Sequence, residues 1–228
     1  MAIDNLIGEL AADLEGYATH RKFPRKVQPE EAAEVAGFLQ QQVDSGVEER
    51  AAAIARSNAK LACTRGCNGC CEEPIMVFRP ESARVGHWLA QPENAEARAA
   101  FLAAYPDWKA RIGDLADKLS ALFETDAANY VAHHVDVWRK GVLCPFNRDG
   151  DCTVYAVRPI SCRTAHALDT NEHCSGTSET PATRATFVPL DNFVARARRL
   201  LMATHNATPG SRGRPQALPH AVYAMLQA

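Results

Sequence analysis

The sequence predicts a mostly helical protein with at most a few short strands, in which irregular cysteine-rich segments lie among the helices. Apolar residues recur every three or four positions along much of the chain, which is the spacing of one face of an α-helix. Prolines and glycines mark where these stretches begin and end. All eight cysteines fall into two groups, within residues 63–71 and 144–174, and the second group has little helical character.

Two helices are expected before the first cysteine group. Between residues 3 and 17, apolar side chains recur at i, i+3, i+4 and i+7. Pro29 suits the first turn of a second helix, and Glu30 and Glu31 suit its positive N-terminal end. Gly46 is expected to divide this helix into two pieces.

One extended segment and four helices are expected between the cysteine groups. Residues 75–78 are short and apolar, as strands are. Pro80 should begin a helix that Pro92 ends, and Gly141 fits a helix stop. The remaining helices are expected over 95–104, 108–123 and 127–139.

The second cysteine group predicts turns and a strand. Asp149-Gly150 is typical of a tight turn, and residues 153–155 are strand-like. Arg158 precedes Pro159, which favours an extended or turn conformation. Two further helices are expected around 193–202 and 219–226.

Length and composition indicate one compact domain. The chain has 228 residues, of which 46% are hydrophobic, so a core does not need the cysteines as a substitute. We divide it into N-terminal helices (1–62), a cysteine-cluster metal-binding region (63–174) and C-terminal helices (175–228).

Charge and hydropathy exclude several partners and compartments. The N-terminus lacks the basic and apolar pattern of a signal peptide. No apolar run approaches the roughly 18 residues of a membrane span. A net charge of −2 gives no general attraction to nucleic acid or to an anionic membrane. We therefore expect a cytoplasmic protein with neither as a partner.

The cysteines are grouped as metal ligands are. In the cytoplasm, clustered thiols indicate metal or redox chemistry rather than structural disulfides. Thiolates bind zinc, or iron in iron–sulfur clusters. Gly66 and Gly69, in the first group CTRGCNGCC, let the backbone turn sharply and bring its amides near sulfur. The expected ligands are Cys63, Cys67, Cys70, Cys71, Cys144, Cys152, Cys162 and Cys174.

Eight thiolates favour an iron–sulfur cluster, of the [4Fe–4S] type, because one zinc needs four at most. Such a cluster would serve a redox or S-adenosylmethionine-linked modification, with a protein or redox partner. The alternative is a zinc-stabilised structural or interaction module without catalysis. Eight thiolates suit two four-ligand centres, or one centre with spare redox thiols. His166 and His173 are alternative ligands. Arginines nearby in sequence are expected to donate hydrogen bonds to the thiolates: Arg65, Arg148, Arg158 and Arg163.

The spacing Cys63-x3-Cys67-x2-Cys70 also occurs in radical S-adenosylmethionine enzymes. Those enzymes place the motif after the first strand of a repeated β/α barrel. This chain has no alternating strand–helix series, so the sequence does not support that fold.

Taken together, the two groups resemble the YkgJ-type cysteine-cluster family, described as a CxxCxxCC zinc- or iron-chelating domain. The resemblance covers roughly residues 63–174 and implies metal binding, by iron–sulfur or zinc. This chain has three residues between its first two cysteines, where the family usually has two. Flagellin lysine N-methylases contain a similar domain and look like iron–sulfur proteins that use S-adenosylmethionine. The matching residues are Cys67-Asn-Gly-Cys70-Cys71, Cys144-Pro-Phe, Asp149-Gly-Asp-Cys152, Val154-Tyr155, Arg158-Pro159 and Cys162-Arg163.

Overall fold

The computed structural model describes residues 8, 10, 16, 26–64, 66–123, 125–211 and 213–227. Within this part of the chain the protein is mostly helical with two very small sheets, which confirms the expected fold class. The helices are α3 (Pro29–Ala55), α4 (Arg79–Ala90), α5 (Ala95–Leu122), α6 (Ala127–Trp138), α7 (Ile160–Thr164), α8 (Val188–Ala207) and α9 (Leu218–Leu226). The helix expected over residues 3–17 lies, except for three positions, outside the described residues.

The two sheets are antiparallel and two-stranded. One pairs β1 (Met76–Val77) with β4 (Gln216–Ala217). The other pairs β2 (Asn147–Arg148) with β3 (Asp151–Cys152). The expected extended segment at 75–78 is therefore confirmed. The strand expected over 153–155 is wrong, because β3 ends at residue 152 and a 3-10 helix follows.

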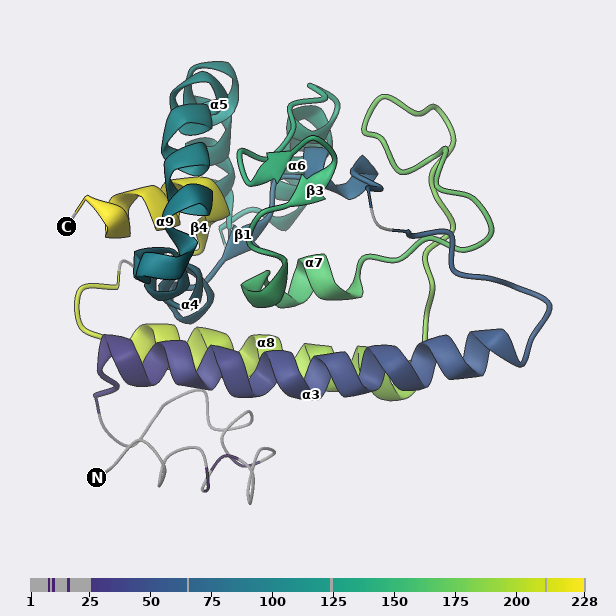
Figure 1. The fold of residues 1–228 in the computed structure, drawn as a ribbon, viewed down its shortest axis with the longest axis horizontal. Coiled ribbons are helices and arrows are strands. Elements are labelled where there is room, and N and C mark those ends of the chain that lie inside the picture. The colour runs from purple at the N-terminus through teal and green to yellow at the C-terminus, as the bar shows by residue number, and fades with distance from the viewer. Residues whose placement is uncertain are drawn as a thin grey trace.

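Helices α3 and α8 lie side by side and antiparallel along one side of the molecule (Figure 1). Helix α3 begins at Pro29 as expected, where the Glu31 carboxylate accepts the Gln28 N–H at 2.9 Å. Gly46 does not divide the helix. A Cβ there would come within 2.8 Å of Leu190 on α8, so glycine permits close packing of the two helices.

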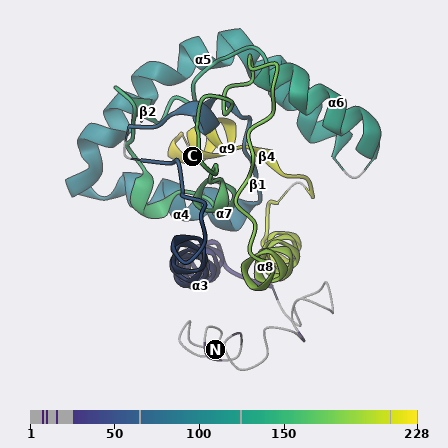
Figure 2. The ribbon, with the colours of Figure 1, turned by 90° about the vertical axis from the view of Figure 1, so that its right-hand side faces the viewer.

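Helices α4, α5, α6 and α9 form the rest of the scaffold, with α5 and α6 arching over the side away from α3 and α8 (Figure 2). The break expected between residues 104 and 108 is wrong, because α5 continues through Pro106. Tyr105 and Trp108, on either side of Pro106, are 5% and 4% exposed. Their burial in the core offsets the hydrogen bond that the proline removes.

The buried apolar side chains form two clusters. One lies mainly between α3 and α8 and includes Ile160 of α7. The other lies among α4, α5, α9 and residues 137–157. Among the described residues, no helix combines the length and apolarity that crossing a bilayer requires.

Local signals located most remaining helices to within a few residues. Helix α4 contains Pro80 in its first turn and ends before Pro92, and α6 matches the expected 127–139. Helix α8 extends several residues beyond the expected 193–202 at both ends, whereas α9 matches closely. The second cysteine group contains one short α-helix, α7, whose Ile160 N–H donates to the Glu81 carboxylate at 2.9 Å. This distant contact explains a helix that the local sequence did not predict.

Candidate metal centre

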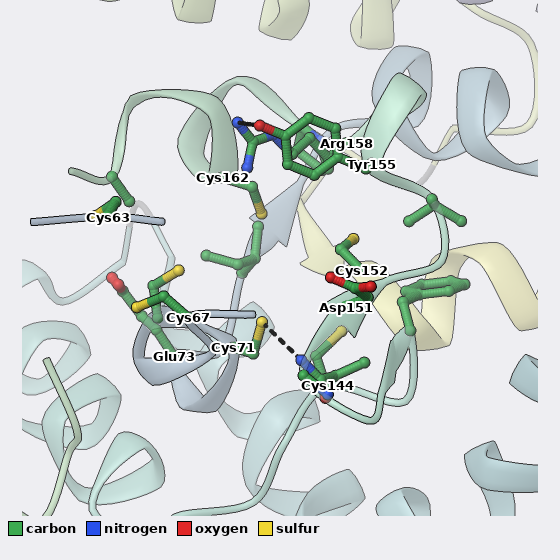
Figure 3. A pocket seen from close by; sticks show the side chains of 18 of the residues that line it. Cys63, Cys67, Cys71, Glu73, Cys144, Asp151, Cys152, Tyr155, Arg158 and Cys162 are labelled. Atoms are coloured by element: carbon green, nitrogen blue, oxygen red, sulfur yellow. Dashed lines mark hydrogen bonds between the residues drawn. The ribbon is translucent and has the colours of Figure 1, made fainter. Parts of the chain in front are cut away.

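Seven of the eight cysteines, drawn from both groups, line one cavity of about 610 Å³ (Figure 3). All eight cysteines lie in the described part of the chain, and none forms a disulfide. The lining thiols are Cys63, Cys67, Cys70, Cys71, Cys144, Cys152 and Cys162. The structure thus brings together residues that lie up to about a hundred positions apart in the sequence.

Cys174 lies just behind the cavity wall. It is 4% exposed, and a Cβ on Gly69 would come within 2.6 Å of the Cys174 Cβ. Only glycine fits at position 69, because any side chain would overlap Cys174. Gly69 is therefore needed for the close approach to Cys174. Gly66 provides the sharp backbone turn that the sequence predicts, with a φ of 85°.

A backbone contact joins the two cysteine groups directly. The first group ends in a 3-10 helix, Gly69–Glu72, which carries Cys70 and Cys71. The Cys71 carbonyl accepts the Cys144 N–H at 2.8 Å. This contact fixes the start of the second group against the first.

The β2–β3 hairpin positions Cys152 on the cavity wall. Its turn has Asp149 at φ 54° and Gly150 at φ 91°, which confirms the predicted tight turn. The Gly150 N–H donates to the Asn147 side chain at 3.2 Å, and Asn147 pairs with Cys152 across the hairpin.

Arg163, next to Cys162 on α7, holds this region to α3 rather than to the thiols. Its guanidinium donates to both Asp44 oxygens and to the carbonyls of Ala156 and Arg158. Arg163 is 6% exposed, which protects its contacts with the two carbonyls, whereas the Asp44 side chain is 48% exposed. The expected hydrogen bonding of Arg163 to thiolates is therefore wrong.

The other expected arginine donors differ from one another. Arg148 forms an ion pair with Glu96 at 2.8 Å, away from the thiols. Arg65 lies outside the described residues. Arg158 does line the cavity, with its guanidinium 3.9 Å from the centre of the Tyr155 ring and 3.2 Å from its hydroxyl. Tyr155 is 60% exposed, so this pair lies where the cavity meets solvent.

Five of the sulfurs accept N–H hydrogen bonds from the protein. Two of the donors are backbone amides placed two residues after the cysteine. Such donors stabilise thiolates and are typical of the surroundings of metal-bound sulfur. The bonds run from Ala167 N to Cys63 at 3.3 Å, from Asn171 Nδ2 to Cys67 at 3.2 Å, from Asn147 Nδ2 to Cys71 at 3.5 Å, and from the backbone of Phe146 to Cys144 and of Val154 to Cys152.

Burial favours the protonated form of the Cys144 and Cys162 thiols. It raises the pKa of Cys144 to about 12 and that of Cys162 well above its ordinary value, with neighbouring thiols adding to both shifts. The pKa of Cys70 is also raised, first by its hydrogen bond with Cys71 and then by burial. A metal would replace these protons with its own charge, so binding should release protons.

The sulfurs surround the cavity rather than a single point. Among the described residues, no three His, Cys, Asp or Glu side chains are grouped tightly enough to hold one metal ion as they stand. Apolar side chains line the wall between them, so that part of the cavity offers few polar groups to water. These apolar residues are Ile75, Phe146, Val154 and Leu218.

The two histidines expected as alternative ligands differ in position. His166 lines the cavity, but its Nδ1 is hydrogen-bonded to Arg50. Burial and then the Arg50 charge lower the pKa of His166 to about 4, so it is neutral at pH 7. His173 is absent from the cavity wall, and its Nδ1 lies 3.2 Å from the Ser178 hydroxyl.

Residues 167–185 form a loop that is closed at its neck. Leu168 N–H donates to the Thr183 carbonyl and Ala185 N–H to the His166 carbonyl, both at 2.9 Å. Arg50, from α3, is 1% exposed and donates to the carbonyls of Thr164 and Ala185. It therefore holds both ends of the loop.

Sequence reasoning missed several residues of the site. Arg184 lies near three of the thiols and pairs with Glu73 at 3.4 Å. Glu73 lies two residues after Cys71 and could have been found by that proximity. Arg184 and the asparagine donors had no local signal, because folding alone brings them to the sulfurs.

Comparison with protein-family models, with curated proteins and with solved structures found no match to this chain.

Proposed function

We propose that this chain binds an iron–sulfur cluster of the [4Fe–4S] type in the cysteine cavity. The observation that carries the proposal is the convergence of seven thiols, from both cysteine groups, on one cavity without a disulfide. Four cysteine thiolates are the usual ligands of such a cluster. The resemblance to YkgJ-type proteins supports metal binding by the same residues.

The number of thiols around the cavity favours a cluster over a single zinc ion. Zinc takes four ligands at about 2.3 Å, whereas seven thiols line the cavity. The hydrogen-bond donors and the nearby Arg158 and Arg184 would balance the negative charge of several thiolates. The apolar wall would limit the access of water to the cluster.

When bound, the cluster would supply electron transfer or S-adenosylmethionine-linked chemistry, and we propose a redox or modification role on this basis. Electron transfer needs a protein or redox partner. The solvent-exposed Tyr155 beside the cavity marks where such a partner or substrate would approach. Eight free thiols suit a reducing compartment, so we propose a cytoplasmic location.

A structural zinc module remains the second candidate. The region between Cys144 and Cys162 has two-residue strands and single-turn helices, which contribute little stability of their own. Bound zinc would hold such a region together without any catalytic role.

Metal and acid-labile sulfide content, measured with a visible spectrum on protein purified without air, tests the proposal. Equal amounts of iron and sulfide with absorbance near about 400 nm would support a cluster. Cys162→Ala should lower both contents, whereas Val131→Ala, on the exposed face of α6, should leave them unchanged. Zinc without sulfide would contradict the cluster and favour the second candidate.

A further inference from the structure

We propose that the eight cysteines form two separate four-thiolate sites that meet at the Cys70–Cys71 step. The first site consists of Cys63, Cys67, Cys70 and Cys174. The second consists of Cys71, Cys144, Cys152 and Cys162. The inference rests on the proposed function and deepens it, since each site would hold one [4Fe–4S] cluster.

The segment that carries Cys174 also holds the first site together. Ala62 N–H donates to the Ala167 carbonyl at 2.9 Å, which anchors the start of the first cysteine group. Ala167 N–H then donates to the Cys63 sulfur, and Asn171 donates to the Cys67 sulfur. Residues 167–174 therefore contact two sulfurs of the first group and contribute a third.

Cys174 lies against the backbone that begins the Cys70 turn. Its Cβ occupies the space next to Gly69, where no side chain fits. Although Cys174 is behind the wall of the main cavity, it is adjacent to the residue that precedes Cys70. This contact assigns Cys174 to the first site.

The second site is built around Cys71. Its carbonyl accepts the Cys144 N–H, and its sulfur accepts a hydrogen bond from Asn147 at 3.5 Å, drawn as a dashed line in Figure 3. Asn147 pairs directly with Cys152 in the hairpin. In Figure 3, Cys144 and Cys152 lie on one side of the cavity, and Cys63 and Cys67 lie on the other.

The nearby charges divide in the same way. Arg184 lies near Cys63, Cys70 and Cys174. Arg158 lies near two cysteines of the second site, 152 and 162. Each site thus has its own arginine to balance thiolate charge.

Cys70 lies at the boundary between the two sites, because it is also close to Cys144 and Cys162 of the second site. Its neighbour Cys71 is committed to the second site by Asn147 and Cys144. Cys70 directly follows Gly69, whose backbone lies against Cys174, so we assign Cys70 to the first site. Four ligands at each site match the number that a [4Fe–4S] cluster needs.

Iron and sulfide per chain, measured on the full chain reconstituted without air, test the division. We expect about eight of each in the unmodified protein, about four in Cys174→Ala and in Cys152→Ala, and almost none in the double variant. About four iron in the unmodified protein, or complete loss in either single variant, would overturn the two-site inference while leaving one cluster intact. No metal at all would instead refute the proposed function.

Two milder variants keep the test valid if a cysteine variant fails to fold. Asn171→Ala removes a donor to the first site only, and Asn147→Ala one to the second only. In electron paramagnetic resonance of the reduced protein, we expect each variant to shift one of two cluster signals. A single signal that both variants shift would overturn the division. About two zinc ions per chain, one lost in each cysteine variant, would support two sites and contradict the cluster identity.

Discussion

The α3–α8 pair and the cysteine-lined region are held together by different forces. Helices α3 and α8 span 27 and 20 residues and bury a continuous apolar face between them. The cysteine region has strands of two residues, and its order depends on scattered hydrogen bonds. The hydrophobic effect stabilises the first region by itself, whereas the second relies on contacts from elsewhere and on the metal that we propose.

The largest effect should come from the helical pair. Leu200 is fully buried in the α3–α8 core, so Leu200→Ala should lower the free energy of unfolding by about 2–5 kcal/mol. The loss should be similar with and without metal, because the cavity lies elsewhere. Urea unfolding measures it, and Val131→Ala, at an exposed site, should change stability by less than about 0.5 kcal/mol. A loss of stability found only in the metal-loaded protein would contradict the view that the α3–α8 pair is stable without metal.

Metal removal should loosen the cysteine-lined region and leave the α3–α8 pair intact. Hydrogen exchange followed by mass spectrometry should show faster exchange over residues 144–174, by about a hundredfold if metal is present at a hundred times its Kd. Exchange in α3 and α8 should change little, since neither helix depends on the thiols. Uniformly faster exchange across the chain would show that the scaffold also needs the metal.

Glu81, on α4, contacts the start of α7 in the cysteine-lined region and should make stability depend on pH. It is 5% exposed, and burial raises its pKa to about 7 despite the hydrogen bond from Ile160 N–H. The unfolded pKa is about 4.3, so the folded state binds more protons between these values. The resulting stabilisation, about 3–4 kcal/mol, is complete below the unfolded pKa and is lost as the pH rises through 7.

Glu81→Gln isolates this contribution, because glutamine keeps the acceptor and removes the charge. Between pH 5 and 8, urea unfolding of the unmodified protein should show the loss of stability, and the variant should lose less. Equal pH dependence in the two proteins would rule out Glu81 as the cause.

The smallest effect is expected beside the cavity. Tyr155 stacks against Arg158 at an exposed position, so Tyr155→Ala should lower the free energy of unfolding by no more than about 1 kcal/mol. Metal content should stay unchanged, because the proposed ligands are cysteine thiolates and neither Tyr155 nor Arg158 is among them. Loss of metal in this variant would show that the contact between Tyr155 and Arg158 also helps to retain the metal in the cavity.

Local signals predicted the helices that depend on local chemistry. Pro80 at the start of α4 and Gly141 after α6 acted as their residue types usually do. Gly46 and Pro106 do not end their helices. Close packing of α3 against α8 outweighs the helix-destabilising effect of Gly46, and burial of the neighbouring aromatic side chains outweighs that of Pro106. Predictions failed where a distant contact decides the local conformation.

The same limit applies to the candidate site. The cysteine pattern predicts eight thiolate ligands, which stays a prediction, and seven of those cysteines share a cavity. The division of the thiols that we propose depends on Asn147, Asn171 and Arg184, none of which is adjacent in the sequence to the sulfur that it lies near. Only the folded chain shows which sulfur each of these side chains lies near.

The closed neck of the 167–185 loop has a consequence for how this chain can vary. Arg50 and the paired backbone hold the two ends of the loop at a fixed separation, whatever lies between them. Doubling the length of a flexible loop costs only about 0.6 kcal/mol. Insertions between residues 179 and 182, beyond the contacts of Ser175 and Gly176 with Glu72, should therefore be tolerated, and related chains should differ in length there while the distance from Cys162 to Cys174 stays constant.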